Sequence, residues 1–132
     1  MNALETGLYT KLSAGTALTT LLGGTAIYNA LATQGTALPY VVFFKSSGGD
    51  DNTSPRRARS LVYTVKAVAD RAYTAGDIDD ELDTLLHEAT LTVTGWNDYW
   101  IMREVDVSYE ERLANGNVVF HRGGQYRIRL SQ

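Results

Sequence analysis

The sequence predicts an α+β fold, with helices packed on one face of a mostly antiparallel β-sheet that ends in a long C-terminal β-hairpin. Leucines recur at helical spacing near the N-terminus, and a second helical stripe lies further along the chain. Two long segments rich in β-formers flank Asn115-Gly116, a strong hairpin signal. This order of elements is typical of helices covering an antiparallel sheet. The length of 132 residues predicts one domain, 1–132.

The N-terminal segment predicts two helices. Asn2 is the expected N-cap of the first, with Glu5 three residues later in a capping-box arrangement. Thr16 is the expected cap of a shorter second helix, and Gly23-Gly24 ends it because glycine adopts the left-handed conformation at little cost. The first helix is predicted by leucines at every fourth position, namely Leu4, Leu8 and Leu12.

The next segments predict strands separated by a loop. Residues 25–28 form a candidate short strand, and residues 40–44 a strand buried on both faces, since apolar residues occupy both alternating positions. Residues 46–55 contain no apolar side chain, so we expect a mobile surface loop. Alternation over residues 61–67 then indicates a strand of about ten residues.

A helix over residues 77–88 is predicted by apolar residues at 3.6-residue spacing. Thr74 or Asp77 is its expected cap, and residues 91–93 form a candidate short strand after it. Acidic side chains crowd the expected first turns, where the helix dipole favours anions. They are Asp77, Asp79, Asp80, Glu81 and Asp83.

The C-terminal hairpin is expected to join residues 99–109 to residues 118–130 through a two-residue type I′ turn, so that paired residues sum to 231. We expect Gly123-Gly124 to accommodate a bulge at most, with no net slip of register. This register gathers the apolar residues on one face and sets opposite charges against each other. The expected polar pairs are Glu104 with Arg127, Asp106 with Gln125 and Glu110 with His121.

Composition excludes several classes of protein. A net charge of −3 and a pI of about 5.3 argue against a dedicated nucleic-acid binder. No apolar run approaches the ~18 residues of a membrane span, and the first twelve residues lack the pattern of a signal peptide. The absence of cysteine excludes disulfides and thiol chemistry. We therefore expect a soluble protein made in the cytoplasm.

Reactive motifs are missing as well. His87 and His121 do not have the spacing of zinc ligands, and we expect structural roles for both. The acidic run from Asp77 lacks the glycine that a calcium loop requires at its sixth position. No glycine pair fits a phosphate-binding motif. We expect no catalytic, metal-binding or cofactor-binding residue.

Three features suggest contacts with other chains. The polar loop 46–55 and its arginines form either an arm that orders on a partner or a solvated loop. The hairpin is long for a small core. The tryptophans, with Tyr99 between them, are either interface anchors or core residues. The candidate interface residues are Arg56, Arg57, Arg59, Asp77, Asp79, Asp80, Trp96 and Trp100.

Three stretches carry a resemblance to a known family: Leu8-Tyr9-Thr10-Lys11-Leu12, then Ala17-Leu18-Thr19-Thr20-Leu21-Leu22-Gly23-Gly24 running into Ile27-Tyr28, then Leu38-Pro39-Tyr40-Val41-Val42-Phe43. Their combination resembles the small tail-completion, or tail-terminator, proteins of long-tailed bacteriophages. The order downstream is similar too, with Val62-Tyr63-Thr64-Val65, then Leu85-Leu86-His87 and two closing strands. The resemblance covers nearly the whole chain, and its motifs carry no reactive residue.

The resemblance implies a virion structural protein that forms a ring, typically a hexamer, at the head-proximal end of the tail tube. Such a ring stops tube polymerisation and presents the surface that joins the head. The implied partners are other copies of the chain, the tail tube protein and a head-side connector protein. DNA passes through the lumen without sequence-specific binding, and no membrane is involved. We expect the arginine cluster to face the acidic helix of a neighbouring copy.

Two other functions remain open from the sequence. A head-side neck or connector protein would share this fold class and differ in its partner. A small α+β enzyme or ligand-binding domain would show a concave apolar pocket with convergent polar groups and a shifted acid.

Overall fold

The computed structural model describes residues 1–97 and 100–132 in full, and gives for Asp98 and Tyr99 only their place in a strand. The expectation that the Tyr99 ring anchors an interface therefore lies outside the described residues. The elements are α1 (Asn2–Ser13), α2 (Thr16–Leu22), β1 (Ile27–Asn29), β2 (Tyr40–Asp50), β3 (Ala58–Ala69), α3 (Ala72–Leu86), β4 (Asn97–Arg112) and β5 (Val118–Ser131). Within the described residues no helix is long and apolar enough to cross a membrane.

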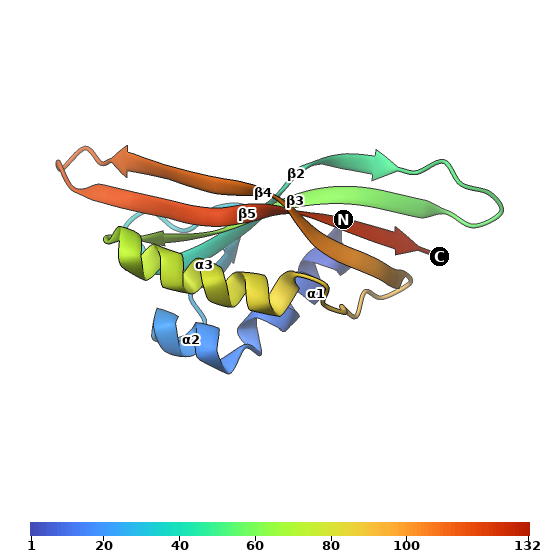
Figure 1. Ribbon diagram of the computed structural model, residues 1–132, viewed down its shortest axis with the longest axis horizontal. Coiled ribbons are helices and arrows are strands. Elements are labelled where there is room, and N and C mark those ends of the chain that lie inside the picture. Colours follow the sequence, from blue (N-terminus) through green and yellow to red (C-terminus); the bar gives the residue numbers. More distant parts are fainter.

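The predicted α+β fold is confirmed. The strands form one sheet in the order β1-β2-β3-β5-β4, in which β1 is parallel to β2 and the other pairs are antiparallel. The three helices cover one face of this sheet and leave the other face open (Figure 1). We call these the helix face and the open face.

The sheet buries apolar side chains on both faces. Val41 and Phe43 of β2 join the main core on the helix face, which α1 and α3 complete with leucines. Val42 joins a small cluster with Val68 and Val119 on the open face. The prediction that residues 40–44 are buried on both sides is therefore confirmed.

The caps of α1 and α2 differ from the prediction. Met1, not Asn2, precedes α1, and its ammonium lies 3.6 Å from the Glu5 carboxylate. Gly15 precedes α2, so Thr16 is the first helical residue and its side chain caps nothing. Both helices form without any side-chain cap. The residue at which each helix starts is therefore set by the burial of its apolar face and not by a capping side chain. Gly23 does end α2 in the left-handed conformation, with φ at 74°.

Helix α3 begins at Ala72, five residues before the predicted start, and it ends at Leu86. Neither Thr74 nor Asp77 caps it, because Arg71 occupies the N-cap position. The buried stripe already begins at Ala75, a small residue that the search for large apolar side chains misses. The acidic run consequently lies beyond the first turn, where the helix dipole contributes little.

Residues 46–50, predicted as part of a mobile loop, continue strand β2 and pair with β3. Backbone hydrogen bonds along the pair hold this polar segment, which needs no burial of its own side chains. Gly48 has φ at 108°, and a Cβ there would lie well under 3.0 Å from the Ser60 backbone oxygen. Glycine is thus required where the two strands approach most closely.

The predicted register of the C-terminal hairpin is wrong. Leu113 donates its N–H to the Asn117 oxygen at 2.7 Å, so three residues connect the strands and Gly116 has φ at 87°. Near the turn Tyr109 therefore lies opposite His121, one residue away from the predicted pairing. Bulges at Arg103/Val105 and Asp98/Trp100 shift the register twice more along the strand. Residues 91–93 form no strand, since only Val93 makes an isolated bridge, to Trp96.

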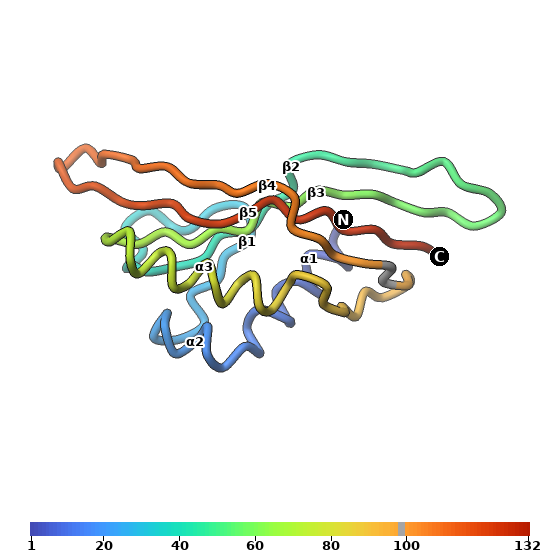
Figure 2. Tube along the Cα trace, in the orientation of Figure 1, coloured from blue at the N-terminus to red at the C-terminus, as the bar shows by residue number. Residues whose placement is uncertain are grey.

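The sheet extends beyond the helices at both ends. The tip of the β2–β3 hairpin projects from one end and the tip of the β4–β5 hairpin from the other, with the helices between them (Figure 2). The two tips are residues 51–57 and residues 113–117. The molecule is therefore elongated and has two different ends.

Candidate functional site

The predicted arginine cluster lies at the β2–β3 tip. Arg57 and Arg59 both reach Asp50, at 2.9 Å and 3.2 Å. The hydrogen bond from Arg57 lowers the pKa of Asp50, with the positive charges adding to the effect. Arg56 is exposed, and among the described residues it has no ion-pair partner. Of the three arginines, Arg56 keeps its charge available to another molecule.

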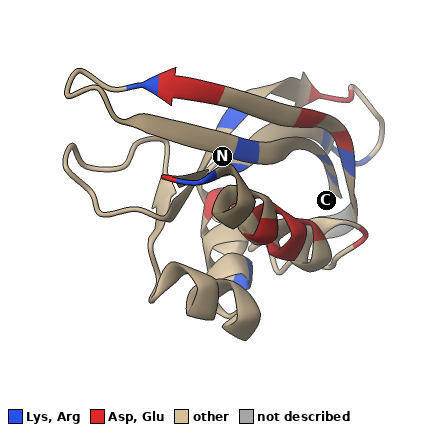
Figure 3. Cartoon of the chain, turned by 60° about the vertical axis from the view of Figure 1, so that its left-hand side comes forward, with Lys and Arg blue, Asp and Glu red and all other residues tan. Residues whose placement is uncertain are grey.

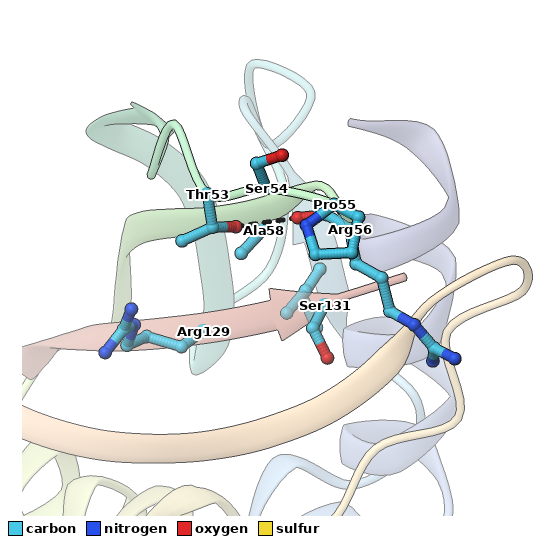
Figure 4. Close-up of a pocket in the computed structure, with 8 residues that line it drawn as sticks. Thr53, Ser54, Pro55, Arg56, Ala58, Arg129 and Ser131 are labelled. Atoms are coloured by element: carbon cyan, nitrogen blue, oxygen red, sulfur yellow. Dashed lines mark hydrogen bonds between the residues drawn. The ribbon is translucent and has the colours of Figure 1, made fainter.

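A hollow of about 380 Å³ lies at the base of this tip (Figure 4). Arg56 and Arg129 lie on opposite sides of it, and Ser131 of the last strand lies between them. Thr53 donates a hydrogen bond to the Arg56 backbone oxygen at 2.8 Å, which fixes the turn. Arg129 pairs with Asp51, so the tip is joined to β5 as well as to β3.

The acidic residues of α3 divide into two groups. Asp79 is held by Arg103 through two hydrogen bonds of 2.8 Å and 3.0 Å. Asp77 and Asp80 have no ion-pair partner among the described residues, and Asp80 is exposed. Figure 3 marks in red the positions of acidic residues along the helix and the strands. Both carboxylates belong to α3, which begins toward the β4–β5 hairpin and away from the β2–β3 tip that carries Arg56 (Figure 1).

Arg103 is the residue that sequence analysis missed. Its guanidinium contacts Asp79 of α3, the Gly123 oxygen of β5 at 2.8 Å and the Tyr126 hydroxyl at 3.2 Å. The Asp79 hydrogen bonds raise its pKa even though burial opposes the charge. Gly124 leaves the space for it, since a Cβ there would lie 2.8 Å from Arg103 Nε. A glycine opposite a long cation is the only sequence signal of this contact.

The two tryptophans lie in different environments. Trp96 packs against the main core on the helix face. Trp100 is half-buried, and its ring lies 6.0 Å from the Arg129 guanidinium carbon. Trp96 thus has the core environment that was one of its two expected roles, while Trp100 belongs to the group around the arginine tip.

His121 and its neighbours form a polar cluster on the open face. The imidazole stacks on Tyr109 with ring centroids 4.3 Å apart and hydrogen-bonds Glu111 at 2.9 Å. Glu110, predicted as its partner, instead pairs with Arg122 on the helix face, because the register differs by one residue. Burial lowers the pKa of His121, although Glu111 opposes that shift. The cluster is held together internally, in keeping with a structural role.

His87 also has a structural contact. Its Nδ1 accepts a hydrogen bond of 3.0 Å from the Arg103 backbone N–H, on the outer edge of β4. Among the described residues, no group of three or more acidic, histidine or cysteine side chains could hold a metal ion.

Comparison with known proteins gives two findings. A family model described as "Tail completion protein gp17" matches residues 6–129. A chain from the structure "Virion of native gene transfer agent (GTA) particle" has the same fold, with a TM-score of 0.82 and 19% sequence identity, over 99% of this chain and 96% of that chain. No curated protein matches the sequence.

Proposed function

Because this chain belongs to the Tail completion protein gp17 family of phage, a structural protein of the virion tail, we propose that it closes the tail as a ring of identical copies. The ring lies at the head-proximal end of the tail tube, stops its polymerisation and forms the surface that joins the head. Its partners are the tube protein and a head-side connector, and DNA passes through its lumen. The related fold from a virion particle supports this location.

The observation that carries the proposal is the difference between the two ends of the molecule. The hairpin tip that carries the unpaired Arg56 projects from one end, while α3, which carries the unpaired carboxylates Asp77 and Asp80, begins on the side of the opposite hairpin (Figure 1). Unlike surfaces on opposite ends generate head-to-tail interfaces, which close into a ring when the rotation between copies permits it. The opposite charges of Arg56 and Asp80 favour this contact over head-to-head contacts.

Charge reversal tests the contact. Arg56→Glu leaves the fold intact, since the side chain is exposed, and blocks ring formation measured by native mass spectrometry. The double variant Arg56→Glu/Asp80→Arg restores the ring, because the charges are exchanged. Lys11→Glu, a reversal on α1, is the matched control and assembles normally. Normal assembly of Arg56→Glu would show that the arginine tip takes no part in the interface.

A further inference from the structure

The outer edge of β4 consists of two unlike halves. Near its start, the Glu88 N–H donates to the Ile101 oxygen at 2.8 Å and the Arg103 N–H donates to His87 at 3.0 Å. From Val105 to Arg112 the strand is regular, and among the described residues no hydrogen bond reaches its outer side. The segment after α3 therefore covers one half of the edge and leaves residues 105–112 uncovered.

Alternation identifies the uncovered backbone groups. The hydrogen bond from Leu113 to Asn117 closes the hairpin, and residues opposite each other alternate between bonded and non-bonded pairs along an antiparallel ladder. Counting back from Leu113 places the peptide groups of Asp106, Ser108 and Glu110 on the outer side. Val105 and Tyr109 are 51% and 42% exposed, so the edge also presents β-forming side chains. An edge of this kind is a template for another strand.

Strand β2 has a matching uncovered edge. β1 pairs only with Val41–Phe43, and Ala30 donates the last hydrogen bond of that side to the Phe43 oxygen at 2.8 Å. Residues 44–50 pair with β3 on one side and with no described strand on the other. Gly48 and Gly49 lie within this segment, so the backbone there is unobstructed by side chains.

The two edges are complementary in direction and position. Beyond the short β1, residues 44–50 of β2 form one border of the sheet and β4 forms the other. β2 and β4 run antiparallel, so copies placed side by side in one orientation bring the two edges together as an antiparallel pair. The segments also lie toward opposite ends of the molecule (Figure 2), which sets the offset between copies.

We propose that neighbouring copies join by antiparallel pairing of the β4 edge at residues 105–112 with the β2 edge at residues 44–50, so that the sheet continues from copy to copy. This inference rests on the proposed ring and names the contact that closes it. The contact is heterologous and is therefore repeated around a closed ring.

A proline at an outward-facing position tests the pairing. Ser108→Pro removes only an outer N–H and keeps the inner ladder, a placement that edge strands tolerate. The variant folds, as far-ultraviolet circular dichroism and a urea transition show, but stays monomeric by native mass spectrometry. Ser108→Ala retains the N–H and assembles like the unchanged chain. A Ser108→Pro chain that folds and forms rings of normal mass would overturn the inference while leaving the ring itself intact.

Disulfide trapping provides a second test that does not depend on the proline variant folding. The chain contains no cysteine, so introduced thiols are the only ones. Ser47 lies on the open face, as do Val105, Val107 and Tyr109. In a variant with Ser47→Cys and a second cysteine at one of these three positions, oxidation links neighbouring copies by disulfide bonds. The products are covalent multimers that form a ladder of bands on a non-reducing gel. Ser47→Cys/Ser108→Cys places the thiols on opposite faces and gives none.

The outcomes separate the inference from the ring. If rings form but no open-face cysteine pair cross-links neighbouring copies, the edge contact is overturned and the ring stands. The same holds if the introduced cysteines cross-link only to the tube protein. A chain that neither forms rings nor cross-links, even with tail tubes present, contradicts the ring and the edge contact together.

Discussion

Arg103 is the residue that joins the helix layer to the sheet. Its guanidinium reaches Asp79 on α3 and both the backbone and a side chain of β5, with Asp106 of its own strand as a further partner at 2.9 Å. Its side chain is only 16% exposed. Removal of the Arg103 side chain would leave the Asp79 carboxylate charged, partly buried and without its partner.

Arg103→Ala is expected to lower the free energy of unfolding by about 3 kcal/mol, because Asp79 and the Gly123 oxygen lose their partner. Urea denaturation measures the change. Arg57→Ala is the matched control, since it breaks an exposed pair with Asp50 that water and salt screen, and it lowers the free energy of unfolding far less. Equal losses in the two variants would show that Arg103 is no more than a surface residue.

Among the elements, β5 is a central strand whose backbone is constrained on both sides. It pairs with β3 on one side and β4 on the other, and Gly123 lies where the Val65 oxygen and Lys66 approach it. A Cβ at Gly123 would lie well under 3.0 Å from both, and backbone atoms cannot move aside as a side chain can. The glycine pair therefore permits a close approach of strands rather than the bulge that the sequence suggested, since the bulges lie in β4.

Gly123→Ala is expected to destabilise the fold by about 3 kcal/mol or more, since the added methyl group overlaps the backbone of β3. Thermal or urea unfolding of the purified variant gives the value. Gly49→Ala provides the comparison, because a Cβ there has nothing within 4 Å and the change is nearly neutral. A Gly123→Ala variant as stable as Gly49→Ala would contradict the strand spacing described above.

Sequence periodicity predicted the helix stripes and the burial of β2, because these depend on which side chains face the core. It could not predict residues 46–50 as a strand, since backbone pairing leaves no apolar signature in Ser46 or Gly48. It also could not place the bulge of β4 at Arg103/Val105, which shifts the register and moves Val105 and Val107 to the open face while Ile101 faces the main core. Glu104 and Arg127 nevertheless form the predicted ion pair, at 2.8 Å, because the bulge at Arg103/Val105 brings them together.

The candidate interface could be predicted only in part, because contacts between distant segments are not visible in the sequence. The sequence indicated two blocks of opposite charge but could not show that Asp50 neutralises much of one and that Arg103 neutralises part of the other. The structure leaves Arg56 at the β2–β3 tip and Asp77 and Asp80 on α3 as the unpaired members among the described residues. Contacts between distant segments of the chain determine which charges remain available.

At the scale of the whole molecule, an elongated sheet carries different hairpins at its two ends and helices on one face only (Figure 1). The proposed contacts between copies use the ends and edges of this sheet and the unpaired carboxylates of α3. In this account its role in the tail follows from closing a ring on the tube.

The most direct test of that role is the distribution of tail lengths in electron micrographs of particles assembled without this chain. The account predicts tails of uncontrolled and excessive length with no heads attached, and a return to one defined length when the chain is supplied. Tails of normal length that fail to join heads would contradict termination and assign the chain to the connector, and normal tails joined to heads would contradict both roles.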